Sequence, residues 1–210
     1  MIKKQKTGRN CMKPFWESEY LNKNRSVFGK QSKEIEEIVS KLPDNAKILD
    51  VGCGDGRNAL YLAAHGFHVD AFDISQNAIE KLNYIKKESG LDINTYICDA
   101  LKFDFRYNYD LIIMHGVLQF IEKEKQPKII ELLKNHTNKG GYHIIALFTD
   151  EEPIPDDLKD AMVGVFKKDE IKGYYAEWST EMFQSYKFND EHENGLKHCH
   201  ALEKIIVRKP

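Results

Sequence analysis

Three glycines with regular spacing follow an apolar run in this chain. Gly52, Gly54 and Gly56 come directly after residues 48–51, Ile-Leu-Asp-Val. Because glycine has no Cβ, such residues can adopt positive φ and let a bound molecule approach the main chain closely. The pattern predicts a strand that ends in a ligand-binding loop whose backbone forms part of the binding surface.

The residues around these glycines separate two classes of nucleotide ligand. A dinucleotide fingerprint needs a third glycine at the position of Arg57, with a helix N-terminus facing the pyrophosphate. Asp55 puts a carboxylate inside the turn, where it would repel a diphosphate but tolerate a cation. The loop therefore favours a sulfonium ligand over NAD.

A second acid follows the next predicted strand. Residues 68–72 alternate polar and apolar side chains and lead into Asp73. The interval after Asp50 suits a strand, loop, helix and next strand, so Asp73 should lie beside the glycine loop and accept hydrogen bonds from ribose hydroxyls. The alternative is that the glycines only turn the chain and that Asp73 only caps the helix near Ser75.

These residues together resemble the motif of the class I S-adenosylmethionine-dependent methyltransferases, an acid followed by x-G-x-G-x-G and a ribose-binding acid after the second strand. The resemblance implies that Asp99 receives the adenine amino group, and Arg57 could pair with the methionyl carboxylate or form only a surface ion pair. The cofactor-binding residues that it implies are Asp50, Gly52, Cys53, Gly54, Gly56, Arg57, Asp73, Ile74, Asp99, Ala100 and His115.

His115 follows the fourth predicted strand, where this fold places residues that face both cofactor and acceptor. It is the catalytic candidate, because it could orient the acceptor or take a proton. A packed histidine bonded to backbone is the alternative. Enzymes of this fold that methylate base amines usually carry Asn/Asp-Pro-Pro-Tyr/Phe here, whereas this chain has His-Gly-Val-Leu, so the sequence disfavours a nucleic-acid substrate.

A longer stretch, roughly residues 47–210, resembles the bacterial tellurite-resistance (TehB-type) methyltransferases and their thiopurine-methyltransferase-like relatives. The likeness lies in residues 56–62, 136–142 and 166–178. It implies in-line methyl transfer to a small nucleophile: a chalcogen oxyanion, a thiol or a similar group. One departure is residues 186–189, Tyr-Lys-Phe-Asn, where the family pattern has Glu-Leu-His-Arg, so an oxyanion site would lack that arginine.

The elements needed to position these residues are readable from periodicity. Short apolar runs predict strands, and amphipathic runs between them predict helices, which together give parallel strands with right-handed crossovers in a three-layer α/β sandwich. Residues 182–188 and 198–208, with a polar turn at 189–195, predict an antiparallel hairpin that completes a Rossmann-like, mostly parallel seven-stranded sheet. The other predicted strands are 47–51, 68–72, 94–98, 109–114 and 141–148, and the helices are 57–65, 76–89 and 123–135.

The first part of the chain differs from the remainder. Helical spacing of apolar residues after Ser32 predicts one helix, and we divide the chain into an N-terminal lid or helical segment, 1–42, and a methyltransferase domain, 43–210. The aromatics before that helix could fold over the cofactor as a lid or pack on the sheet edge. They are Phe15, Trp16, Tyr20 and Phe28.

Composition restricts the partners further. The chain has 210 residues, 41% of them hydrophobic, and a formal net charge of −2, which favours a small-molecule substrate over nucleic acid. It has no apolar run long enough for a membrane span, and its four cysteines lack C-x-x-C spacing, so we expect a cytoplasmic monomer or homodimer with reduced thiols. His198-x-His200 supplies only two imidazoles, so no metal is expected.

The alternatives to the predicted methyltransferase function are an NAD-type oxidoreductase, a non-catalytic regulatory module that binds the same cofactor, and aminopropyl transfer.

Overall fold

The structure, a computed structural model, describes residues 16–191 and 197–210, apart from the side chains at positions 190, 191, 197 and 198. Several predictions therefore lie outside the described residues, wholly or in part. They concern the start of the N-terminal segment with Cys11 and Phe15, most of the turn at 189–195, and the side chain of His198.

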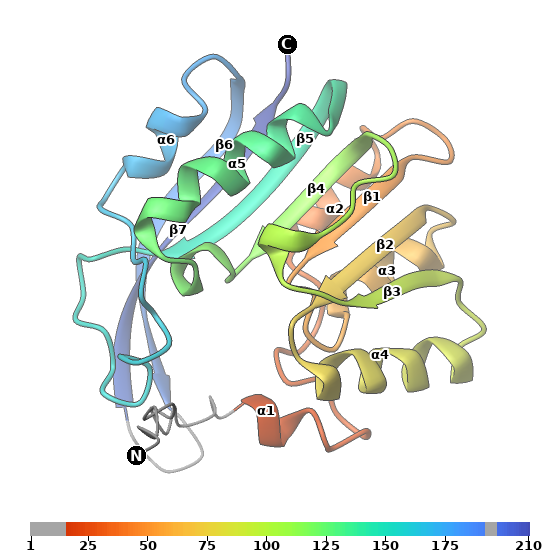
Figure 1. Cartoon of the computed structure of the whole chain (residues 1–210), viewed down its shortest axis with the longest axis horizontal. Coiled ribbons are helices and arrows are strands. Elements are labelled where there is room, and N and C mark those ends of the chain that lie inside the picture. Colours follow the sequence, from red (N-terminus) through yellow and green to blue (C-terminus); the bar gives the residue numbers. More distant parts are fainter. Residues whose placement is uncertain (1–15, 192–196) are drawn as a thin grey trace, which may run out of the picture.

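Seven strands form a single sheet with the order β3-β2-β1-β4-β5-β7-β6 (Figure 1). Neighbouring strands from β3 to β5 are parallel, whereas β7 runs antiparallel to both β5 and β6. The predicted fold class, a mostly parallel sheet closed by a C-terminal antiparallel hairpin, is confirmed. The strands are β1 (Lys47–Val51), β2 (His68–Asp73), β3 (Ile93–Ile97), β4 (Tyr109–His115), β5 (Thr137–Phe148), β6 (Ser179–Glu191) and β7 (Lys197–Arg208).

Helices cover both faces of the sheet (Figure 1). Side chains alternate along each strand. Leu49 therefore packs in the core cluster that contains Ile129 and Ile171, whereas Ile48 packs in the cluster that contains Ile35 and Leu62. The helices are α1 (Trp16–Glu19), α2 (Lys33–Val39), α3 (Arg57–Ala64), α4 (Gln76–Glu88), α5 (Gln126–Asn135) and α6 (Glu170–Tyr174). None of the helices in the described part of the chain is long and apolar enough to span a bilayer.

Two boundaries differ from the predicted ones for local reasons. The helix predicted at 123–135 starts as a 3-10 turn, η3 (Lys123–Lys125), and α5 begins beside Pro127, whose missing N–H is not needed in a first turn. β5 begins at Thr137 rather than at residue 141, because Thr137 pairs with Tyr109 before a shift in the strand register. The predicted alternation of strands and helices is otherwise present.

The carboxyl ends of the parallel strands meet at one edge of the sheet. The glycine loop follows β1, Asp73 ends β2, Asp99 follows β3 and His115 ends β4. The helices after β1 and β2 start in different ways: Gly56 has φ +83° before α3 and makes no side-chain cap, whereas the Ser75 hydroxyl accepts from the Ala78 N–H at 3.1 Å before α4. The fold therefore gathers the predicted polar residues along one edge.

Candidate active site

A cavity of about 860 Å³ lies along this edge and follows the order of the strands. One part, the glycine-loop end, is lined by Gly52, Gly54, Asp73, Ile74 and Asp99. The other part, the hairpin end, is lined by Phe148, Phe188, His200, Leu202 and Lys204. His115 lines the cavity from β4, which lies between the strands that form the two ends. Such a cavity has the size of a small-molecule site.

The three glycines of the loop have different surroundings. All have positive φ, and Gly52 and Gly54 line the cavity, as expected of backbone that receives a ligand. Gly56 is not among the described residues that line it. A Cβ at Gly56 would lie 2.4 Å from Leu82 Cδ1, so the structure gives this glycine a packing role between the start of α3 and the middle of α4.

The prediction that Asp55 faces the ligand is wrong. Asp55 is 2% exposed, is absent from the described cavity lining, and pairs with the buried ammonium of Lys81 at 3.0 Å. Its carboxylate also accepts from the Val27 N–H at 2.8 Å. Asp55 therefore fastens the N-terminal segment to the glycine loop. The acids that line the cavity near the glycine loop include Asp50, Asp73 and Asp99.

Asp73 holds the glycine loop in place and still has lone pairs that can accept hydrogen bonds from a ligand. One carboxylate oxygen accepts from the Gly54 N–H at 2.9 Å and the other from the Ser75 N–H at 2.8 Å. Each oxygen can accept a second hydrogen bond. Burial raises the pKa of Asp73, and these two backbone donors oppose that effect. Beside it Ile74 is 74% exposed, an apolar surface at the rim of the cavity.

Asp99 begins a short turn beside the same end of the cavity. Its Oδ1 accepts from the Leu101 N–H at 2.9 Å and caps η1 (Ala100–Lys102). Asp99, Ala100 and Leu101 all line the cavity, as does Cys53 of the glycine loop. The residues predicted to surround a nucleobase are therefore together.

Asp50 is a buried acid with a free oxygen in the cavity wall. It is 2% exposed, and its Oδ2 has no hydrogen-bond partner among the described residues. Burial raises the pKa of Asp50 to about 7, although the Arg57 charge and the Ala59 N–H favour the ionised form. An unpaired buried carboxylate of this kind suits a cationic ligand.

His115 and Arg57 form one hydrogen-bonded unit. Nη2 of Arg57 lies 3.3 Å from Nδ1 of His115, and Nη1 donates to the Phe28 carbonyl at 2.7 Å. Because a guanidinium only donates, Nδ1 is the acceptor and the ring hydrogen is on Nε2. Burial, and then the positive charges of Arg57 and Lys204, lower the pKa of His115 to about 3. His115 is thus a neutral donor at physiological pH.

The N-terminal aromatics cover part of the cavity. Trp16, Tyr20 and Phe28 all line it. The Trp16 ring packs edge-on against Phe120 with centroids 5.2 Å apart, and Tyr20 is buried against the glycine loop. These aromatics thus line the cavity, while their position over a bound cofactor and their movement as a lid stay predictions.

The hairpin end combines aromatic rings with one ion pair. His200 lies between Phe148 and Phe188, with ring centroids 4.9 and 5.3 Å away. Lys204 on β7 pairs with Glu34 on α2 at 2.7 Å. Neither member of this pair belongs to a motif, because the contact joins positions far apart in the sequence.

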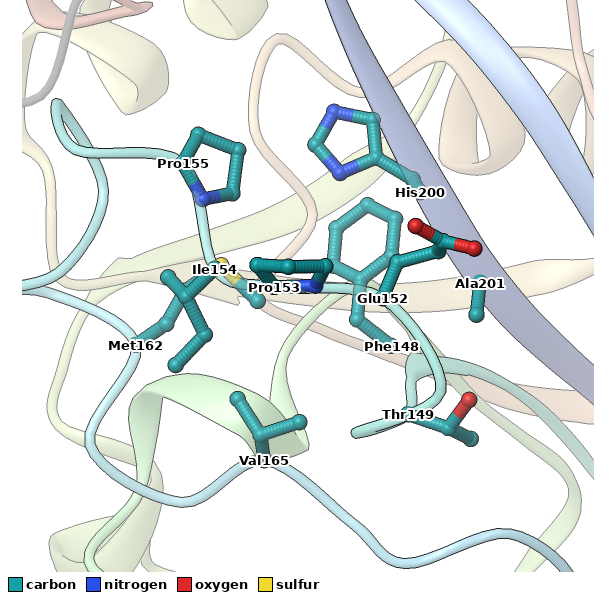
Figure 2. A pocket seen from close by; sticks show the side chains of 10 residues that line it. All are labelled: Phe148, Thr149, Glu152, Pro153, Ile154, Pro155, Met162, Val165, His200 and Ala201. Carbon is teal, nitrogen blue, oxygen red and sulfur yellow. The ribbon is translucent and has the colours of Figure 1, made fainter.

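A much smaller crevice lies behind this wall. Its volume of about 10 Å³ accommodates no more than one water molecule. Figure 2 shows side chains that line it, among them Phe148 and His200 from β5 and β7, and Pro153, Met162 and Val165 from the loop after β5. Phe148 and His200 line both spaces, so they form the partition between them.

Comparison with known proteins assigns the family. A family model described as tellurite resistance protein TehB matches residues 15–200. A curated relative, the probable S-adenosyl-L-methionine-dependent methyltransferase TehB of Haemophilus influenzae, is 36% identical over 179 residues, which are 81% of this chain and 59% of that protein. The chain thus spans about three-fifths of the length of this relative.

Solved structures support the same family assignment. The crystal structure of TehB from Haemophilus influenzae has a TM-score of 0.76 and 30% identity, and the match covers 86% of this chain and 63% of that one. The N-methyltransferase NodS from Bradyrhizobium japonicum, in complex with S-adenosyl-L-homocysteine, shares the fold at a TM-score of 0.64 and 16% identity over 84% of each chain. By sequence and by fold, the chain belongs to the TehB family of class I S-adenosylmethionine-dependent methyltransferases.

Proposed function

We propose that this protein transfers a methyl group from S-adenosylmethionine to a small nucleophile, a chalcogen oxyanion, a thiol or a similar group. The observation that carries the proposal is Asp73, which ends β2 and lines the cavity beside the backbone of Gly54. A carboxylate in this position can accept from ribose hydroxyls. Its place next to the glycine loop supports binding of a nucleoside.

The other residues fit the same cofactor. The free Oδ2 of Asp50 suits a positive charge, the exposed Ile74 offers an apolar surface to a base, and Asp99 can accept from an amino group. Arg57 has further N–H groups for a carboxylate. The sulfonium of the cofactor, when bound, supplies an activated methyl group with a neutral thioether as leaving group.

The residues of the chain then contribute positioning rather than acid–base chemistry. The acceptor donates an electron pair to the methyl carbon while the carbon–sulfur pair leaves with the sulfur, so an anionic acceptor needs no proton removed. The neutral His115, which carries its hydrogen on Nε2, can orient an acceptor by donating to it. The covering aromatics Trp16 and Phe120 exclude water from the site.

Calorimetry with S-adenosylhomocysteine and with NAD tests the cofactor, and the expected result is binding of the first only. Asp73→Ala should weaken that binding by about 1–3 kcal/mol, because charged hydrogen bonds in a buried site are lost. Asp73→Asn keeps a hydrogen-bond acceptor and should weaken it less, and exposed Asp104→Ala should have no effect. Equal affinity in Asp73→Ala would overturn the ribose assignment, and NAD binding would favour the oxidoreductase alternative.

The acceptor is tested by measuring S-adenosylhomocysteine formation with selenite, tellurite, thiols and amines. Turnover of thiols or the oxyanions is the expected result. Cofactor binding without turnover of any of them would favour the regulatory module. Action in the cytoplasm as a monomer or homodimer, and the division into a lid segment at 1–42 and a catalytic domain at 43–210, stay predictions.

A further inference from the structure

Gln119 carries a buried amide without a partner. It is 0% exposed, and neither its Oε1 nor its Nε2 has a hydrogen-bond partner among the described residues. An unmet polar atom in such a place destabilises the folded chain. Buried amides are normally satisfied, so two unmet atoms on one side chain point to a partner that is not part of the chain.

The amide lies in the wall of the cavity. Gln119 belongs to η2 (Leu118–Phe120), which follows β4, and it lines the cavity with Gly116. A Cβ built on Gly116 would lie 3.7 Å from Nε2 of Gln119 and would meet no other atom within 4 Å. A side chain at Gly116 would therefore come into contact with the amide.

The main chain around the amide is fixed. The Gln119 carbonyl accepts from the Gly164 N–H at 2.9 Å, which fastens the loop after β5 to η2. The neighbouring Gln126 has a structural role instead, since its Nε2 donates to the carbonyls of Leu118 and Ile121 at 3.0 and 3.2 Å. Gln126 is thus engaged through its Nε2, whereas both amide atoms of Gln119 lack a partner among the described residues.

We propose that Gln119 contacts the methyl acceptor and recognises a group on it that both donates and accepts a hydrogen bond, such as a carboxamide or hydroxyl. The inference rests on the proposed function. In the proposed function Asp50, Arg57, Asp73 and Asp99 account for the polar groups of the cofactor, whereas Gln119 lines the cavity from η2, which follows β4, the strand between the two ends of the cavity.

The pairing of donor and acceptor defines the chemical class. A group that only accepts, such as a carboxylate or a fully deprotonated oxyanion, would satisfy Nε2 and leave Oε1 unmet. A carboxamide or hydroxyl satisfies both atoms. Gln119 therefore selects an acceptor with a group that both donates and accepts over one with a group that only accepts.

The test compares two thiols of almost equal shape, mercaptoacetamide and isobutyl thiol. Mercaptoacetamide has a carboxamide at the position where isobutyl thiol has a carbon with two methyl groups. Wild-type protein should have the higher kcat/KM with mercaptoacetamide. Gln119→Leu and Gln119→Met, which keep the volume but not the amide, should each lower the ratio of the two kcat/KM values about tenfold. A ratio that stays the same would overturn the proposal.

Two further measurements separate this inference from the proposed function. Both variants should bind S-adenosylhomocysteine as wild type does and should have equal or greater stability in urea, because an unmet amide is replaced by an apolar group. Weaker cofactor binding would place Gln119 against the cofactor, and lower stability would reveal an internal partner, such as a water shared with Oε1 of Gln126, which is also unmet. Weaker cofactor binding or lower stability of the variants would each overturn the proposal. Both measurements can be made even if wild-type protein methylates neither thiol, so they do not depend on the proposed thiol acceptor.

Discussion

Asp50 makes cofactor binding sensitive to pH near neutrality. Burial raises the pKa of Asp50 to about 7, so the free protein gains a proton there as the pH falls, and the negative charge that suits a cationic group is lost. We expect the affinity for S-adenosylmethionine, which carries the sulfonium charge, to fall about tenfold per pH unit below that value. Calorimetry at several pH values measures the slope.

Asp50→Asn is the decisive variant for this prediction. It removes the titrating group, so its affinity should be weaker than that of wild type at alkaline pH and nearly independent of pH. Exposed Asp104→Asn is the control and should keep the wild-type slope. An unchanged slope in Asp50→Asn would assign the pH dependence to another group.

His115 is expected to orient the acceptor rather than to remove a proton. With a pKa lowered to about 3 and Nδ1 occupied by Arg57, it is a weak base in the physiological range. His115→Ala should therefore lower turnover about tenfold without an effect on cofactor affinity. The pH profile of kcat should keep its shape; a loss of about a hundredfold or more together with a lost inflection would restore the general-base role.

Sequence patterns locate single residues where the backbone makes them recognisable. Asp73, Asp99 and His115 could be predicted to lie in one site because each follows an apolar strand, and parallel strands end at one edge. Gln119 could not, since an amide inside Leu-Gln-Phe looks like a surface residue. The prediction for Asp55 was wrong because its partner Lys81 lies in α4, far along the chain, and no local pattern in the sequence indicates that pairing.

At the scale of elements, the Asp55–Lys81 pair holds the N-terminal segment to the glycine loop. The Lys81 ammonium also donates to the Arg25 carbonyl at 2.7 Å, and both charged side chains are almost fully buried. Lys81→Met removes one charge and leaves the other unpaired, so the free energy of unfolding should fall by about 3–5 kcal/mol. Urea denaturation measures the loss.

The surface pair of Lys159 and Asp156 supplies a matched control, because both side chains are largely exposed. Lys159→Met should change the free energy of unfolding by less than about 1 kcal/mol. If Lys81→Met were equally mild, the segment would be held by other contacts, and the anchoring role of Asp55 would be lost.

The elements themselves were predictable in proportion to their length and regularity. Strands between residues 47 and 148 are short apolar runs, and the helices between them follow a period of 3.6 residues, so their predicted order agrees with the structure. α6 has five residues, too few for a period. β6 is longer than predicted because pairing with β7 extends it, and that pairing depends on the partner strand rather than on its own sequence.

For the whole molecule, a buried histidine makes stability depend on acid. His143 lies in the core, where Thr137 Oγ1 is 2.7 Å from Nε2 and the Tyr175 hydroxyl 2.8 Å from Nδ1. Because Thr137 gives its own hydrogen to the Leu133 carbonyl, the histidine hydrogen is on Nε2 and the ring is neutral. Burial, and then the charges of Lys209 and Lys134, lower the pKa of His143 to about 3.

The direction in which pH changes the stability follows from the protonation of this histidine in the folded and in the unfolded chain. An unfolded histidine has a pKa of about 6.5, so below that pH the unfolded chain binds a proton that the folded one does not. The free energy of unfolding should fall by about 1.4 kcal/mol per pH unit below 6.5 for this one group. Urea titrations across that range should show a shallower slope for His143→Asn than for wild type, whereas exposed His68→Asn should keep the full slope.

The position of β7 has a consequence for biosynthesis. This strand follows every other strand in the chain, yet it occupies the interior of the sheet between β5 and β6. It also carries His200 and Lys204 to the hairpin end of the cavity. While the ribosome still holds residues 197–208 in its exit tunnel, β5 has an open edge and that end of the cavity has no wall, so a nascent chain has neither a finished sheet nor a complete site.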